Sequence, residues 1–159
     1  MSTLWIIAII VLSMGMVAGP ALALRLGKGA QRQQQLRSKA RELGLQVSME
    51  PLPQREGDKG HTLIAVYRLQ LHKHLPKHIN HCARRSRIDH NEWMFLRNRP
   101  PLEQYEALLK LYKKLPADVE AIDCQSAVIS AWWHERGGES SLQALQQQLQ
   151  QIADIQYPH

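Results

Sequence analysis

Cysteine is scarce in this sequence, and no catalytic signature is present. Only two of the 159 residues are cysteines, Cys82 and Cys124. They could pair in an oxidising compartment, whereas a domain in the cytoplasm would keep them reduced. The chain lacks a G-x-S-x-G motif, a glycine loop that could cradle a phosphate, and a clear pair of carboxylates. His81 precedes Cys82, but sequence neighbours rarely form a nucleophile and its base, and no third orienting group is evident. These absences argue against an enzyme, and we expect no cofactor.

Charged side chains are also absent from the first part of the chain, between Thr3 and Leu24. At a rise of about 1.5 Å per residue, a helix over this run is about 33 Å long. That is enough to cross a hydrocarbon core of about 30 Å. We therefore predict three regions: a transmembrane anchor over residues 1–24, a basic juxtamembrane helix or linker over residues 25–44, and a single domain over residues 45–159.

The charges on either side of the apolar run predict its orientation. No Lys or Arg precedes the run, whereas six of them follow it before the first acid, Glu42. Positive charge marks the side of a membrane that stays in the cytoplasm. We therefore expect a single-pass protein of the bacterial inner membrane, with its N-terminus outside and its domain in the cytoplasm. The same charge pattern argues against a cleaved secretory signal that ends at Ala21-Leu22-Ala23.

Two glycines in the predicted anchor are four residues apart, Gly15 and Gly19. This spacing places them on one face of a helix, where two backbones can approach closely. Glycine is also common in membrane helices that have no such role. The spacing therefore leaves a homodimer through this helix face as an open alternative.

Basic residues cluster directly after the apolar run. Lysine and arginine at a membrane exit meet anionic lipid headgroups, and each contributes on the order of 1 kcal/mol near the surface. The segment from Ala30 to Leu43 has helical spacing and stops at Gly44, which predicts a stalk helix. Within this region we expect four side chains to face the membrane lipid: Arg25, Lys28, Arg32 and Arg37.

The layout of the first part is similar to that of small bacterial proteins with one membrane helix and an outward N-terminus. The segment from Arg25 to Arg41 contains the run Gln-Arg-Gln-Gln-Gln. It resembles the basic, glutamine-rich exit of the YajC family, the accessory subunits of the Sec preprotein translocase. The resemblance covers residues 3–41, and the glycine-rich cytoplasmic segment of that family has no match here. It implies an accessory role beside an inner-membrane protein partner and transfers no functional residues to this chain.

The rest of the sequence predicts a domain of mixed strands and helices. Apolar and polar residues alternate over residues 45–50 and 62–71, and the second run is apolar on both faces near its middle, as in an inner strand. Helical spacing begins after Pro101 and ends at Pro116, and it returns over residues 139–155. Three more strands are predicted over residues 93–96, 119–124 and 127–135. The last two form a predicted hairpin, with a helix over residues 118–136 as the alternative. This order predicts an α+β fold with a mostly antiparallel sheet and two helices after the stalk.

One segment is rich in potential metal ligands. Imidazole and thiolate groups bind zinc well, but the spacing here matches no standard zinc signature and Pro76 interrupts it. The surrounding lysines and arginines would also oppose a bound dication. We therefore predict a solvated basic loop, with a metal site as the alternative. The residues of that alternative are His72, His74, His78, His81 and Cys82.

Positive charge is concentrated in residues 68–99, where eight lysines and arginines accompany two acids. Such a surface suits a phosphate-bearing partner, either nucleic acid or the anionic lipid near a tethered domain. Trp93 and Phe95 fall in a predicted core strand, which removes the aromatic side chains that would stack on bases. We therefore expect no nucleic acid partner. Three arginines of this stretch are expected to face lipid headgroups or solvent: Arg84, Arg85 and Arg87.

These features lead to two hypotheses about function. The first is a membrane-tethered accessory or scaffold protein whose cytoplasmic domain contacts an inner-membrane assembly. The alternative is a metal-binding sensor or enzyme that uses residues 72–82. Neither the composition nor the motifs identify a particular partner or substrate.

Overall fold

The computed structural model describes residues 27–55, 57–58, 62–72, 80–125 and 127–156. The chain forms two units, residues 1–35 and residues 36–159. In the first unit, the structure describes residues 27–35, which include the start of helix α2 (Lys28–Glu42). The predicted anchor over residues 1–24 lies outside the described residues. None of the helices within the described ranges is long and apolar enough to cross a membrane.

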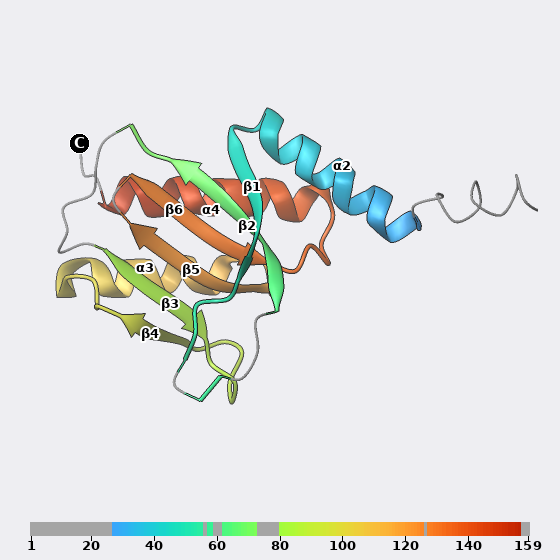
Figure 1. Cartoon of the computed structure of the whole chain (residues 1–159). Helices are drawn as coiled ribbons and strands as arrows, with labels where there is room; N and C mark the ends of the chain where they lie inside the picture. The colour runs from blue at the N-terminus through green and yellow to red at the C-terminus, as the bar shows by residue number, and fades with distance from the viewer. Residues whose placement is uncertain (1–26, 56, 59–61, 73–79, 126, 157–159) are drawn as a thin grey trace, which may run out of the picture. The chain divides into compact units, whose positions relative to one another are not determined.

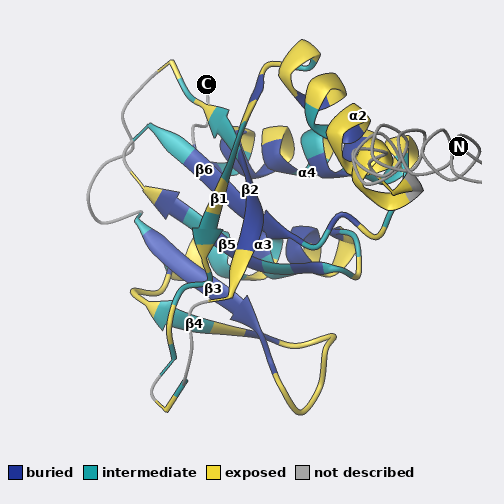
Figure 2. Ribbon diagram, turned by 45° about the vertical axis from the view of Figure 1, so that its right-hand side comes forward, coloured by how far each residue is buried: buried dark blue, intermediate teal, exposed yellow. Residues whose placement is uncertain are grey.

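The second unit is built on one sheet of six strands in the order β1-β2-β6-β5-β3-β4 (Figure 1). Every neighbouring pair of strands is antiparallel, which confirms the predicted α+β fold with an antiparallel sheet. Burial is greatest in the four inner strands and least in the edge strands β1 and β4 (Figure 2). The strands are β1 (Leu45–Pro51), β2 (Leu63–Gln70), β3 (His81–Arg85), β4 (Trp93–Arg97), β5 (Val119–Gln125) and β6 (Val128–Trp133).

One face of the sheet is covered by helices α3 (Leu102–Lys114) and α4 (Glu139–Gln156), which lie side by side (Figure 1). Successive strand residues point to opposite faces of a sheet. Tyr67, Ile122 and Trp133 point to the helices and form one buried apolar cluster with them. The helices add apolar stripes to this cluster, chiefly Leu108, Leu111, Tyr112, Leu142, Leu145, Leu149 and Ile152.

The last turns of α2 join the same cluster. Leu36 and Ala40 are buried in it, so the C-terminal part of the predicted linker belongs to the domain. Gly44 follows the helix at a φ of 80°, a conformation that glycine adopts without steric cost. Its N–H donates to the carbonyl of Arg41 at 3.0 Å, which confirms the predicted helix stop.

Strand β3 was not expected from the sequence pattern. The prediction of a solvated loop up to Cys82 is wrong at its C-terminal end, because all five residues of β3 are buried. The strand lies between β5 and β4, with His81 opposite Cys124 and Arg84 opposite Ala121. Charged residues can be buried where acceptors inside the protein replace water. The predicted hairpin, in contrast, is confirmed as β5 and β6.

Candidate anion-binding site

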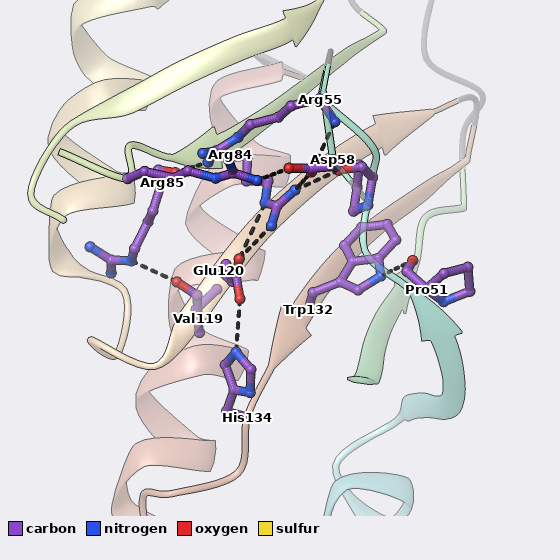
Figure 3. A network of polar contacts seen from close by, with 11 residues as sticks. Pro51, Arg55, Asp58, Arg84, Arg85, Val119, Glu120, Trp132 and His134 are labelled. Carbon is purple, nitrogen blue, oxygen red and sulfur yellow. Dashed lines mark hydrogen bonds and ion pairs between the residues drawn. The ribbon is translucent and has the colours of Figure 1, made fainter. Parts of the chain in front are cut away.

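Residues 52–55, 57 and 58 lie on the face of the sheet opposite the helices, and we call them the strap. Leu52 packs against a small apolar cluster on this face that includes Val66 and Trp132. The indole Nε1 of Trp132 donates to the carbonyl of Pro51 at 2.9 Å, directly before the strap (Figure 3). These contacts fix the strap to strands β2 and β6.

Arg84 connects the strap to the middle of the sheet (Figure 3). From strand β3, its Nη1 donates to the carbonyl of Pro53 at 3.0 Å and to Oδ2 of Asp58 at 2.5 Å. Its Nη2 donates to Oε1 of Glu120 at 2.7 Å. The Arg84 side chain is only 8% exposed, so the two carboxylates neutralise a charge that has lost most of its water.

Glu120 is shared between Arg84 and His134. The second carboxylate oxygen, Oε2, lies 2.8 Å from Nε2 of His134. Burial alone would raise the pKa of Glu120, but the hydrogen bonds and charges of Arg84 and His134 outweigh it. The pKa of Glu120 is therefore below its ordinary value, and the carboxylate is ionised at neutral pH.

Arg85 is also buried, but main-chain oxygen rather than carboxylate surrounds it. No carboxylate of the described residues lies within 4.0 Å of its guanidinium. The guanidinium carbon lies 4.9 Å from the centre of the Trp93 ring, a cation–π distance. Burial lowers the pKa of Arg85. Its guanidinium donates to the carbonyls of Val119, His90, Leu115 and Pro116 at 2.6, 2.7, 3.3 and 3.1 Å.

The two neighbouring arginines line a pocket of about 270 Å³, which we call the arginine pocket. Its lining includes five arginines, two histidines and two acids. These residues come from the strap, from β3 and the turn after it, from the start of β5, and from the segment after β6. The arginines are Arg55, Arg84, Arg85, Arg87 and Arg136, and the histidines are His90 and His134.

Both acids in the lining already hold partners. Glu120 binds Arg84 and His134. Oδ2 of Asp118 accepts hydrogen bonds from the main-chain N–H groups of Arg136 and Gly137, at 2.7 and 3.4 Å. The negative charge that lines the pocket is therefore already engaged.

Arg55, in contrast, has no carboxylate partner within 4.0 Å among the described residues. Its Nη2 donates to the carbonyl of Arg85, while its Nε is buried and meets no acceptor in the part of the chain that the structure describes. Burial, together with repulsion from Arg84 and Arg87, lowers the pKa of Arg55. Among the described residues, the lining of the pocket therefore carries more positive charge than the nearby acids neutralise.

The structure brings together the three arginines that the sequence placed in a basic patch, but not as a flat surface. Arg84 and Arg85 are buried, so they hold the strand and the strap in place. Arg87 has a side chain that is 65% exposed and pairs with Oδ1 of Asp58. Only Arg87 of the three has the exposure that was expected of all of them.

The four predicted lipid-facing residues also differ in where they lie. Arg25 lies outside the described residues, and Lys28 and Arg32 are in the part of α2 that belongs to the first unit. Arg37 points to the domain, where its Nε and Nη2 each donate to Glu135 at 2.7 Å. The glycine pair predicted for helix contact, Gly15 and Gly19, also lies outside the described residues.

The potential metal ligands that the structure describes, His72, His81 and Cys82, do not point to a common site. His81 forms a hydrogen bond of 2.5 Å with the hydroxyl of Tyr112 on the helix-covered face. Cys82 points to the opposite face, and burial raises the pKa of its thiol to about 12. Of the remaining candidates, His72 is exposed, and His74 and His78 lie outside the described residues. Within the described ranges, no group of three or more His, Cys, Asp or Glu could hold a metal ion.

Sequence analysis did not single out Arg55, His134 or Arg136 as residues of a site. They lie in two segments far apart in the sequence, since Arg55 is on the strap and His134 and Arg136 follow β6. The contacts of Arg84 with Pro53 and Glu120, together with the pairing of β5 with β6, bring these two segments together. The spacing of these three residues in the sequence does not indicate that they line one pocket. The excess of bases over acids in residues 68–99 was the one available signal, and it marked only part of the pocket.

Comparison with known proteins finds no relative of this chain. No protein-family model, no curated protein and no solved structure matches the chain. Any function proposed for it therefore depends on the chemistry of its own residues.

Proposed function

We propose that this chain is a membrane-tethered accessory protein that recognises an anionic group of its partner through the arginine pocket. The uncharged apolar run and the basic segment after it support the tether. The observation that carries the recognition is the charge imbalance of the pocket. Five arginines line it, whereas the acids that face them among the described residues are Asp118, Glu120 and Asp58, and all three are already bound.

The arrangement of the arginines suits recognition of an anion. Arg84 is neutralised by Asp58 and Glu120 and fixes the strap to the sheet. Arg85 is fixed by main-chain carbonyls and supplies positive charge that does not move. Arg55 and Arg87 lie on the strap and on the turn after β3, where an incoming anion can reach them. Hydrogen bonds from a guanidinium to an anion are stronger than those between neutral groups. The pocket is thus organised to bind before a partner arrives, which lowers the entropy cost of binding.

The chemistry of the domain favours binding over catalysis. Burial raises the pKa of both Cys82 and Cys124 to about 12. Both thiols are therefore protonated at neutral pH, and a protonated thiol is a poor nucleophile. His134 is bound to Glu120, which also serves Arg84. These observations support an accessory role rather than an enzymatic one.

Purification of the tagged full-length protein from its own membranes in mild detergent tests the proposal. The pocket variant combines Arg55→Gln with Arg87→Gln. The control combines Arg99→Gln with Lys113→Gln, which removes the same charge from two exposed positions. We expect mass spectrometry to find a defined set of inner-membrane proteins with the natural protein and the control, and to find it depleted with the pocket variant.

Three other outcomes decide against the proposal. A protein that purifies without partners would remove the accessory role. Partners retained in full by the pocket variant would remove the arginine pocket from recognition. A solitary protein that carries zinc in stoichiometric amount would favour the metal-binding alternative. Circular dichroism of each variant shows whether it has folded before these results are interpreted.

A further inference from the structure

The arginines of the pocket differ in how many of their donors are already used. Arg84 donates to Pro53, Asp58 and Glu120, and Arg85 donates to four main-chain carbonyls. Figure 3 shows the contacts of Arg84 with Asp58 and Glu120 and that of Arg85 with Val119. Arg55 and Arg87 have fewer protein acceptors. A ligand would therefore make its direct contacts with these two side chains.

The amount of uncompensated charge indicates the charge of the ligand. Two guanidinium groups, those of Arg55 and Arg85, have no carboxylate within 4.0 Å among the described residues. A carboxylate ligand would offset one of these charges. A phosphate monoester carries a charge of about −1.5 to −2 at pH 7, so it would offset both.

The positions of the donors indicate the shape of the ligand. Arg55 approaches from the strap and Arg87 from the turn after β3, and Asp58 lies between Arg87 and Arg84. Donors from different segments can satisfy a tetrahedral group with three terminal oxygens, whereas a carboxylate presents two oxygens in one plane. Arginine is the preferred side chain for recognising phosphate in this way.

The size of the pocket limits what can accompany the phosphate. Its volume of about 270 Å³ is just below the range of roughly 300–1,000 Å³ that holds drug-sized ligands. A phosphoryl group with a small carrier, such as a glycerol unit, fits this space better than a complete nucleotide does.

We infer that the arginine pocket binds the phosphoryl group of a phosphate monoester, with Arg55 and Arg87 as its direct contacts. This inference rests on the proposed function, because it names the anion that the pocket recognises. The group can belong to a soluble phosphate ester or to the headgroup of a membrane lipid, and both present the same oxygens. The positive charge of Arg85, which main-chain carbonyls fix in place, adds to the attraction.

Calorimetric titration of the full-length protein in uncharged detergent tests the inference. Inorganic phosphate and acetate are compared at pH 7.5 and equal ionic strength. We expect phosphate to bind at least about tenfold more tightly than acetate, and the variant with Arg55→Gln and Arg87→Gln to lose at least about tenfold in phosphate affinity. The control with Arg99→Gln and Lys113→Gln should keep the natural affinity. Equal affinity for the two anions, or an unchanged affinity in the pocket variant, would overturn the inference.

Two further measurements identify the source of the phosphoryl group. Competition of glycerol phosphate with phosphate for the detergent-solubilised protein tests whether the pocket accepts an ester, and the lipid experiment then decides between the two sources. Reconstitution into phosphatidylcholine nanodiscs, with and without phosphatidic acid, tests the headgroup. A lipid phosphate that occupies the pocket should weaken the apparent binding of added phosphate by about tenfold, only when phosphatidic acid is present.

The titration and the purification of partners fail independently. Partner proteins that depend on the arginine pocket, found together with no preference for phosphate, would overturn this inference and leave the accessory role in place. Phosphate binding that depends on Arg55 and Arg87, found without any partner protein, would remove the accessory role and leave this inference in place.

Discussion

The two faces of the sheet are closed by different forces, and two neighbouring tryptophans show the contrast. Trp133 points to the helices, is fully buried, and packs edge-on against Tyr67 with ring centres 5.1 Å apart. Trp132 points to the strap, is 6% exposed, and donates a hydrogen bond to Pro51. The first face is closed by apolar packing. The second is closed by directional contacts to a short segment of chain.

This contrast explains why the pocket lies where it does. Apolar packing leaves no space and no charge for a ligand. A strap held by arginines brings charged groups to a partly enclosed position, and its own acids neutralise only some of them. The helix-covered face should therefore carry most of the stability, whereas the strap face holds the pocket for which we propose binding. Four substitutions test this division.

The largest expected effect comes from the helix-covered face. Trp133→Ala removes the largest fully buried side chain and should lower the free energy of unfolding by about 3–5 kcal/mol. Denaturant unfolding of the full-length protein, followed by far-ultraviolet circular dichroism, measures this loss. Leu63→Ala is the matched control, since its side chain is 57% exposed, and it should change stability by less than about 0.5 kcal/mol. Equal effects of the two substitutions would contradict the division.

The next largest effect should come from the centre of the strap face. Arg84→Met keeps the length of the side chain but removes the cation that Asp58 and Glu120 share, which leaves Asp58 with Arg87 and Glu120 with His134. Both carboxylates retain some contact with water, so we expect a loss of about 2–3 kcal/mol, below the 3–5 kcal/mol typical of a fully buried pair. Combining Arg84→Met with Asp58→Asn and Glu120→Gln should restore part of this stability. A triple variant less stable than Arg84→Met alone would show that the charges do not act on one another.

The same contrast explains how much could be predicted from the sequence. The helix-covered face was predictable, because apolar side chains at periods of about 3.6 and 2 record which side of each element is buried. The residues of the strap face show no such periodicity in the sequence. Arg84 meets Asp58 across 26 residues and Glu120 across 36 residues. A local interpretation of the sequence therefore shows an excess of charge, and it predicts a solvated loop that extends over His81 and Cys82, the first two residues of β3.

Part of the site could still be identified before the fold was known. Arg84, Arg85 and Arg87 stood out because they are close in sequence, and they do line one pocket. Their roles could not be predicted, since burial of an arginine depends on acceptors contributed by other segments. Arg55 was missed for the same reason, because it reaches the pocket only through the position of the strap.

A smaller effect should separate the two tryptophans. Trp132→Phe removes the hydrogen bond to the Pro51 carbonyl and should cost about 1 kcal/mol, together with faster hydrogen exchange in the strap. The amide of Arg55, which donates to Oδ2 of Asp58 at 3.1 Å, reports this loosening. Trp133→Phe is the matched control, because its indole Nε1 meets no acceptor among the described residues. It should lower stability through packing and leave the exchange of the Arg55 amide unchanged. Faster exchange in both variants would mean that the strap responds to the stability of the whole domain.

The smallest effect should appear as a dependence on pH. The hydrogen bonds and charges of Arg84 and His134 hold the pKa of Glu120 below its ordinary value of 4.5. A carboxylate with a lowered folded-state pKa stabilises the protein above its unfolded-state pKa, and this contribution is lost as the pH falls through the folded-state value. Glu120→Gln should therefore lower stability at pH 7 by about 1 kcal/mol or less, since the Glu120 side chain is 29% exposed. Its stability should also fall less steeply than that of the natural protein below about pH 4.5. Glu106→Gln, at an exposed position of α3, is the matched control and should follow the natural protein over the whole range. An identical acid limb in the Glu120→Gln variant would show that the ionised carboxylate does not hold the strap face together.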